Sequence, residues 1–317
     1  MKEYKILGQQ DTRSGFAEGL LQAGKENKDV VALCADLTPS VRMDLFAKEF
    51  PDRFFQVGIA ESNMVGIASG MALSGKIPFV GSFAAFSTGR VYDQIRQSVA
   101  YSNTNVKIAG SHAGITLGED GATHQILEDI GLMRMLPNMV VINPCDFNQT
   151  KQATIATARY NGPVYLRFGR PKVPVFIPED MPFEIGKALM LNGGKDVSIF
   201  ATGHLVWQAI EACKQLEQEG ISAELINIHT IKPLDTEAIL KSASKTKCVV
   251  SCEEHLYNGG LSDAIAQTLV RQMPVPMEYV GIDDKFGQSG KPMQLMEYYH
   301  LMAEDIVMAA KKAIKRK

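Results

Sequence analysis

The sequence predicts an α/β protein of two domains, the first of which contains a parallel sheet covered by helices on both faces. Short runs of apolar and β-branched residues alternate with segments of helical pattern over most of the chain. The strand-like runs are apolar on both faces, as is typical of parallel strands that lie between two layers of helices. A length of 317 residues suits two hydrophobic cores better than one.

The first half of the chain alternates predicted strands with predicted helices. In chain order, the strand-like runs are DVVALCAD (29–36), RFFQVG (53–58), IPFVGSFA (77–84), VKIAGSHA (106–113), MVVINP (139–144) and VYLRFG (164–169). Helical patterns cover residues 12–28, 41–50, 61–75, 91–101 and 147–160. This alternation is the pattern expected of a parallel sheet whose strands are joined by helical crossovers.

A proline-rich segment separates the first half from a second half with the same alternation. The prolines Pro171, Pro174, Pro178 and Pro182 interrupt a stretch in which no long regular element is expected. Beyond them, strands are predicted at 196–203, 222–230 and 247–254, and helices at 205–220, from about residue 234, and at 261–273. We therefore expect a first domain at residues 1–175 and a smaller α/β domain at residues 186–317.

Charge and composition exclude several classes of partner. The formal net charge is −2, so neither nucleic acid nor an anionic membrane is expected to bind the chain. No apolar run approaches the ~20 residues of a membrane span, and the first residues lack the apolar segment of a signal peptide. A cytoplasmic location is therefore expected, with the cysteines reduced.

Two common cofactor motifs have no support. The segment GMALSGKI (70–77) approaches the phosphate-loop pattern, but it runs from a predicted helix into a strand and lacks the final hydroxyl residue. No G-x-G-x-x-G fingerprint follows a strand, so a nicotinamide cofactor is not indicated.

Polar and aromatic residues follow the carboxyl ends of the predicted strands, where parallel α/β sheets bind their ligands. In chain order they are Asp36, Ser40, Glu61, Phe83, Phe86, His112, Asp120, His124 and Arg170. Carboxylates, aromatic rings, histidines and an arginine gathered at one rim are what a cofactor or substrate pocket requires.

Glu61 is the least expected member of this set. It is the only charged residue in QVGIAESNMVGIASG (56–70), and a carboxylate is costly to bury without a partner. The acid could instead favour a helix N-terminus through the macrodipole. In the same way, the phenylalanines could fill a core, the aspartates could cap turns, and the histidines and arginines could be structural or solvated. Their coincidence at successive strand ends favours a site.

The motifs resemble those of the transketolase family. In order and spacing they match its pyrimidine-binding and C-terminal domains: ADLTPS (35–40), GIAES (58–62), SFAAF (82–86), GEDGATHQ (118–125), LPNMVVINPCD (136–146) and LRFGRPKVP (166–174). The resemblance covers essentially the whole chain, but only the C-terminal half of that enzyme. It implies a parallel-sheet domain that binds the pyrimidine of thiamine diphosphate, followed by a smaller α/β transketolase C-terminal domain.

The resemblance implies cofactor-binding roles for four residues. Glu61 stands where transketolases have the acid that hydrogen-bonds N1′ of the aminopyrimidine and so promotes deprotonation of the thiazolium. Phe83 and Phe86 match the aromatic residues that stack on the pyrimidine, and Asp36 matches an acid close to the cofactor.

The other candidates match substrate-binding residues of the family. His124 corresponds to a catalytic histidine near the ketose hydroxyl, and Asp120 to an acid that binds a substrate hydroxyl. The group that holds the phosphate of a sugar phosphate is matched by Arg13, Ser40, His112 and Arg170. Guanidinium groups suit a phosphate dianion because they can donate two parallel hydrogen bonds.

Two positions depart from the family pattern, and one family motif is not found. Ser62 stands where many transketolases have histidine, and Gly89 where a third pocket aromatic is usual. The GDG…N motif that binds diphosphate and metal in the family is missing from this sequence. The resemblance therefore implies one subunit of a split transketolase. A separate subunit carrying the N-terminal half would bind the diphosphate and its Mg²⁺ or Ca²⁺ ion in an α2β2 assembly, and no residue of this chain is expected to bind metal.

Three other functions compete with this interpretation. The β subunit of a 2-oxoacid dehydrogenase has a similar length and glutamate, but such subunits lack ADLTPS and GEDGATHQ. Deoxyxylulose-phosphate synthase shares DGATHQ but lacks ADLTPS. A non-catalytic α/β binding module would tolerate replacement of Glu61 and His124. We expect instead transfer of a two-carbon ketol unit from a ketose phosphate to an aldose phosphate, with the xylulose and ribose phosphates of the pentose phosphate pathway as the family's usual pair.

Overall fold

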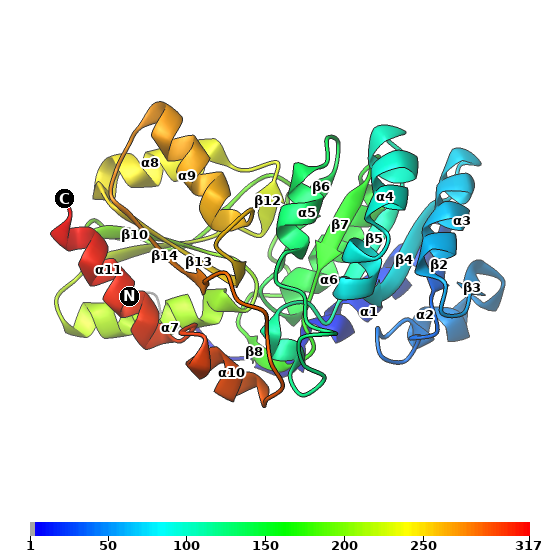
Figure 1. Ribbon diagram of the computed structural model, residues 1–317, viewed down its shortest axis with the longest axis horizontal. Helices are drawn as coiled ribbons and strands as arrows, with labels where there is room; N and C mark the ends of the chain where they lie inside the picture. Colours follow the sequence, from blue (N-terminus) through cyan, green and yellow to red (C-terminus); the bar gives the residue numbers. More distant parts are fainter. Residues whose placement is uncertain (1–3) are drawn as a thin grey trace.

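The computed structural model describes residues 4–317 and contains two sheets, each packed between helices (Figure 1). A seven-stranded sheet lies in the N-terminal half and a five-stranded sheet in the C-terminal half. A third, two-stranded sheet pairs β1 (Gly8–Asp11) with β8 (Lys172–Val175) in antiparallel fashion. The expected α/β fold with two main sheets is confirmed.

The larger sheet is parallel except at one edge. Its order is β12-β6-β7-β5-β4-β2-β3. The six strands from the N-terminal half are β2 (Val30–Cys34), β3 (Phe54–Gln56), β4 (Ile77–Phe83), β5 (Lys107–Ser111), β6 (Val140–Ile142) and β7 (Val164–Arg167). Strands β2, β5 and β7 are buried along their whole length, which explains the continuously apolar sequence of β2.

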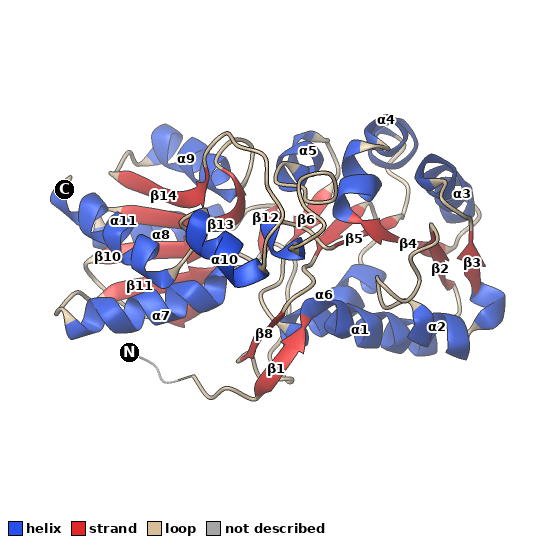
Figure 2. Ribbon diagram, turned by 60° about the horizontal axis from the view of Figure 1, so that its bottom comes forward, coloured by secondary structure: helices blue, strands red, loops and turns tan. Residues whose placement is uncertain are grey.

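Helices cover both faces of this sheet (Figure 2). One layer contains α1 (Thr12–Glu26), α2 (Asp44–Glu49) and α6 (Phe147–Arg159), and its core includes Phe16 and Leu20. The other layer contains α3 (Glu61–Leu73), α4 (Tyr92–Gln94), the π-helix η3 (Ile95–Tyr101) and α5 (Asp129–Met135). The helix expected at 91–101 is therefore a short α-helix that continues as a π-helix.

The smaller sheet has the order β14-β13-β10-β11-β9, with only β9 antiparallel to its neighbour. Its strands are β9 (Leu189–Asn192), β10 (Val197–Ala201), β11 (Ala223–Asn227), β13 (Val249–Leu256) and β14 (Met277–Ile282). Helices α7 (Leu205–Gln218), α10 (Pro292–Tyr298) and α11 (Ala303–Lys315) contribute to one core, and α8 (Thr236–Thr246) and α9 (Leu261–Gln272) to another.

One expected element of the second half is wrong. The run 222–230 does not form a single strand, because β11 ends at Asn227 and a separate strand, β12 (Thr230–Lys232), pairs with β6 of the larger sheet. The amide of Asn143 donates to the carbonyl of His229 at 2.8 Å, which extends this pairing beyond the strand. The chain thus leaves one sheet and immediately completes the edge of the other.

The two halves also share a hydrophobic core. One cluster of buried side chains contains Ile130 and Met133 of α5 together with Leu261 and Ile265 of α9.

No helix within residues 4–317 is both long enough and apolar enough to cross a membrane.

Candidate active site

The candidate residues gather where the strand order of the larger sheet reverses. After β3 the chain crosses to the other side of β2, so the carboxyl ends of β2 and β4 flank the reversal point. Open α/β sheets bind ligands outside the carboxyl ends of their strands at such points. Glu61 opens α3 after β3, Phe83 ends β4, and His112 follows β5.

Four rings form the aromatic part of this region. Phe83 and Phe86 lie nearly parallel, at 11° and with ring centroids 5.8 Å apart. The ring of His112 stacks on Phe83 at 3.9 Å, and His124 meets Phe86 edge-on at 5.3 Å. Phe83 is buried and contributes to a core, whereas Phe86 is only half-buried. Phe83 therefore contacts both histidines, and the half-buried Phe86 contacts His124.

Glu61 is paired with an arginine that the sequence analysis did not identify. The carboxylate is 3% exposed, and Nη1 of Arg90 donates to both of its oxygens at 3.2 Å. The guanidinium carbon of Arg90 also lies 4.4 Å from the centroid of the Phe86 ring. Arg90 supplies the positive charge that a buried carboxylate needs. Its signal was its position in SFAAFSTGR, at the same strand end as both phenylalanines.

A cluster of positive groups surrounds His112. Nη1 of Arg13 donates to the carbonyl oxygen of Ser40 at 2.9 Å and lies 3.4 Å from Nε2 of His112. Nη2 of Arg13 donates to the carbonyl oxygen of Arg170 at 3.4 Å. The other ring nitrogen of His112, Nδ1, is 2.8 Å from Oγ of Ser111. Arg13 therefore contacts the three other residues expected to bind an anion, Ser40 and Arg170 through their backbone carbonyls.

The arginines of this cluster have acids nearby. Asp11 lies 3.5 Å from Nε of Arg13 and 4.0 Å from Nη2 of Arg42, and Glu119 lies 3.6 Å from Nη1 of Arg170. Burial lowers the pKa of Arg13, and Arg42 and Arg170 lower it further against the opposing effect of Asp11. Burial, with Arg13 and Arg170 adding to it, lowers the pKa of His112 to about 3. At the ring of His112 the neighbouring charges that shift the pKa are both positive, and a positive local potential favours an anion. The arrangement is suited to a terminal phosphate or a similar group.

Acid is expected to destabilise the protein through His112. Because the pKa of His112 is lowered from 6.5 to about 3, the unfolded chain binds a proton below pH 6.5 that the folded chain does not. The stability associated with neutral His112 is present above that pH and is lost as the pH falls towards 3. Between about pH 7.5 and about pH 5.5 the loss from this residue should be about 1 kcal/mol.

Urea unfolding of the wild type and His112→Gln at both pH values measures this contribution. The variant should lose less stability on acidification, by about 1 kcal/mol. His229, whose pKa burial also lowers, to about 4, is present in both proteins and cancels. An equal loss in both proteins would contradict the assignment.

The loop 118–125 carries two further candidates. Nδ1 of His124 is 2.9 Å from Oγ1 of Thr123, and its ring faces Phe86 as described above. The exposed carboxylate of Asp120 lies 4.0 Å from Nη1 of Arg170, which also donates to the carbonyl oxygen of Leu117 at 2.9 Å. The loop therefore adjoins both the aromatic and the positive parts of the site.

Asp36 is the one candidate that lies apart from these contacts. It has a positive φ of 59°, and its amide donates to Oε1 of Gln56 at 2.6 Å. Within residues 4–317 its side chain makes no hydrogen bond or ion pair with the other candidates. Its place at the carboxyl end of β2 nevertheless puts it on the same edge of the sheet.

The C-terminal half braces the loop that follows His112. Oε1 of Glu254, at the end of β13, accepts a hydrogen bond from the amide of Thr116 at 2.8 Å, and Oε2 lies 3.4 Å from Nδ1 of His204. Gly114 has a φ of 81°, and a Cβ there would lie 2.2 Å from Oε1 of Glu254. Only glycine leaves room for this approach.

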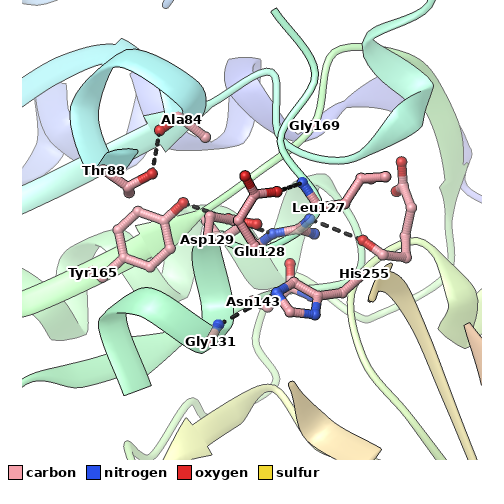
Figure 3. Close-up of polar contacts among 12 residues, drawn as sticks. Ala84, Thr88, Leu127, Glu128, Asp129, Gly131, Asn143, Tyr165, Gly169 and His255 are labelled. Carbon is pink, nitrogen blue, oxygen red and sulfur yellow. Dashed lines mark hydrogen bonds and ion pairs between the residues drawn. The ribbon is translucent and has the colours of Figure 1, made fainter. Parts of the chain in front are cut away.

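A buried ion pair continues this junction (Figure 3). Oδ2 of Asp129 accepts hydrogen bonds from the hydroxyl of Tyr165 at 2.6 Å and from Nε of Arg167 at 2.8 Å. Nη2 of Arg167 donates to the carbonyl oxygen of Glu254 at 2.9 Å. None of the site residues predicted from the sequence lies in the second half of the chain, beyond the proline-rich segment. The signal that could have indicated this contribution is the pair of acids that ends the apolar run CVVSCEE.

Within residues 4–317, no group of three or more His, Cys, Asp or Glu side chains is arranged to hold a metal ion. What the site offers is a buried acid, an aromatic face, two histidines and an anion-binding cluster. These features can bind a planar ring at one end and an anion at the other.

Comparison with known proteins identifies the family. Residues 8–175 match the family model of the transketolase pyrimidine binding domain, and residues 186–306 match that of the transketolase C-terminal domain. The putative transketolase C-terminal section of Methanocaldococcus jannaschii is 45% identical over 307 residues, which are 96% of each chain. A 6-deoxy-6-sulfo-D-fructose transketolase subunit of Clostridium sp. is 42% identical over 305 residues, covering 96% of this chain and 95% of that protein.

A solved structure has the same fold over almost its whole length. It is a split gene transketolase, described as an inactive β4 tetramer, and it aligns with a TM-score of 0.92 at 45% identity. The alignment covers 97% of this chain and 99% of that one. Members of this family generally use thiamine diphosphate and a divalent metal. From its motifs, its fold and these matches, the chain belongs to the transketolase family and spans the pyrimidine-binding and C-terminal domains of that family.

Proposed function

We propose that this chain is the subunit of a split transketolase that binds the pyrimidine end of thiamine diphosphate. With a partner subunit it transfers a two-carbon ketol unit from a ketose phosphate to an aldose phosphate. Residues 1–175 act as the pyrimidine-binding domain and residues 186–317 as the C-terminal domain. The observation that carries the proposal is a continuous set of contacts that runs from Glu61 to Arg13, in the order Glu61, Arg90, Phe86, Phe83, His112 and Arg13. It supports one site with an acid, an aromatic wall and an anion-binding end.

The residues of this chain fit the aminopyrimidine ring. The planar guanidinium of Arg90 lies over Phe86 and hydrogen-bonds Glu61, so this position suits a flat, polar group. Glu61 would donate a proton to the ring nitrogen N1′, and Phe83 and Phe86 would form the stacking wall, with Asp36 at its edge. When bound, the cofactor supplies the electron sink for cleaving the bond next to a ketose carbonyl.

The remaining candidates are assigned to the substrate. His124 would hold and move a proton at a sugar hydroxyl, and Asp120 would bind a second hydroxyl. Arg13, Ser40, His112 and Arg170 would hold the terminal anion. The two arginines whose charges lower the pKa of His112 support this role. A sulfonate offers similar geometry with less charge, and the name of one 42% identical relative specifies a sulfo sugar.

A partner subunit is needed to complete the site. The sequence has no GDG…N motif, so the diphosphate and its Mg²⁺ or Ca²⁺ ion are assigned to a separate chain that carries the N-terminal half. The rim beside Glu61 is open: Ile59 is 77% exposed, and Leu73 at the far end of α3 is 78% exposed. The exposed side of α3 between them has no charged residue, which is unusual for a helix face in contact with water. We assign this face to the partner, in an α2β2 assembly.

The partner dependence is the first expected result. The isolated chain with thiamine diphosphate and Mg²⁺ should show negligible ketol transfer from xylulose 5-phosphate to ribose 5-phosphate, because it holds only one end of the cofactor. Addition of a subunit carrying the GDG…N half should restore turnover, measured by a coupled assay of the product phosphates. Substantial activity of the isolated chain would refute the split-enzyme assignment.

Arg170→Ala is expected to affect phosphorylated sugars selectively. Loss of a charge-assisted hydrogen bond should raise KM for the ketose phosphate by about tenfold to a hundredfold in the assembled enzyme. KM for the same ketose without its phosphate should change little. Lys172→Ala, at an exposed position two residues further along, serves as the control. Equal changes in KM for both sugars would place Arg170 outside the anion site. Use of 6-deoxy-6-sulfofructose as a third donor tests whether the same site accepts a sulfonate in place of the phosphate.

A further inference from the structure

The position assigned to the cofactor ring is filled by a side chain of the protein itself. Arg90 makes the two contacts that the proposed function gives to the aminopyrimidine: its guanidinium lies 4.4 Å from the centroid of the Phe86 ring, and its Nη1 bonds both oxygens of Glu61 at 3.2 Å. A guanidinium is planar and delocalised, so it stacks on an aromatic face much as a heterocycle does.

The two partners of Glu61 exclude one another. An ion pair with Arg90 calls for a carboxylate, whereas the hydrogen bond to N1′ calls for a carboxyl group that donates its proton. Only one planar group can lie against the same face of Phe86. Binding of the ring therefore requires Arg90 to leave both contacts.

The position of Arg90 allows its side chain to move away from Glu61 and Phe86. Its side chain is 51% exposed although its partner is 3% exposed, so the guanidinium can move into water without desolvation. The preceding residue, Gly89, is loosely packed, because among residues 4–317, its neighbours in the chain aside, a Cβ added there would meet one atom within 4 Å, Cδ1 of Ile126 at 3.9 Å. Arg90 follows directly on the π-helix η2 (Ala85–Gly89), and η3 begins five residues later. Such π-type segments are rare and occur mostly at functional sites.

We propose that Arg90 is an internal stand-in for the aminopyrimidine ring, which holds Glu61 and covers Phe86 until the ring displaces it. This inference rests on the proposed function. It assigns to Arg90 a role in setting cofactor affinity, because binding must first break the Arg90–Glu61 pair and the apparent affinity is reduced by that equilibrium. Before assembly, Arg90 also supplies the hydrogen bonds that the buried carboxylate of Glu61 needs.

The test measures binding of the ring alone to the full-length subunit. The probe is 4-amino-5-hydroxymethyl-2-methylpyrimidine, which is neutral and lacks the diphosphate, so neither the partner nor charge repulsion by Arg90 enters. Affinities come from NMR titration of wild type, Arg90→Ala and the control Arg96→Ala, an exposed arginine on η3. We expect Arg90→Ala to bind about tenfold more tightly than wild type, and Arg96→Ala to match wild type.

A second background separates displacement from a general loosening of the site. In Glu61→Gln the pair is already broken, so adding Arg90→Ala should give little further gain. Equal or weaker binding by Arg90→Ala, an equal gain in both backgrounds, or no binding of the probe by Arg90→Ala would each overturn the proposal. Ketol transfer by the wild-type assembly is read separately, so the proposed function can stand while this inference fails.

Discussion

Glu61→Gln is expected to lower ketol transfer by the assembled enzyme about 10³-fold. Glutamine keeps the size of the side chain and a hydrogen-bonding group, but it cannot hand a proton to and from the ring nitrogen. The substitution should leave the fold intact, because Arg90 is half exposed and can turn into solvent when its partner is neutralised. Turnover is measured with saturating thiamine diphosphate, Mg²⁺ and partner subunit, and folding by thermal unfolding.

The matched control is Glu237→Gln, the same change at an exposed acid in the first turn of α8. Its turnover should stay close to that of the wild type. Glu61→Ala, tested in the same assembly, discriminates between classes of function. Unchanged turnover in both Glu61 variants would reject the catalytic assignment and favour a non-catalytic module.

Arg167→Met is expected to destabilise the protein by about 3–5 kcal/mol. Asp129 is fully buried, and its charged partner lies 2.8 Å away with only 4% of its side chain exposed. Burial alone would lower the pKa of Arg167, but Asp129 and Glu254 raise it above its ordinary value, so the guanidinium is charged at neutral pH. Removing the arginine leaves a buried carboxylate without its countercharge.

Urea unfolding of the full chain measures this effect. Arg159→Met provides the control, because Arg159 bonds Glu26 at the same 2.8 Å but on the surface, with its side chain 68% exposed. That variant should lose less than about 1 kcal/mol. In an Asp129→Leu background, Arg167→Met should cost much less than in the wild type, since no buried charge is left unpaired. Similar losses for both arginine variants would contradict the buried-pair argument.

The strands that could be predicted from the sequence are those buried on both faces. The run VVALC is apolar throughout and VSIFA has one polar residue, Ser198; they form β2 and β10 within the expected limits. The strand β1 has the polar sequence GQQD, and its partner β8 contains Pro174, so neither carries an apolar signal. Both depend on pairing between segments more than 150 residues apart, which local pattern does not encode.

The candidate site follows the same division. The placement of Glu61, Phe83 and His112 at one edge of the sheet could be predicted, because each lies at or shortly after the end of a predicted strand and strand ends meet at one edge of a parallel sheet. The contribution of Glu254 could not, because it arises from packing of the second half against the loop after His112. Arg90 reaches Glu61 across 29 positions through a turn of irregular helix. Periodicity contains no information on such contacts.

The short strand β12 limits how this protein can be divided. Family boundaries suggest that residues 1–185 could be expressed alone, yet that fragment would lack β12 and leave β6 as a bare edge, open to pairing with other chains. It would also expose the side chains of α5 that pack with α9. The two family domains are thus separate segments of the sequence, but in the folded protein they share a sheet and a hydrophobic core. A fragment for structural or engineering work would need the residues around 230 supplied in trans or grafted onto its end.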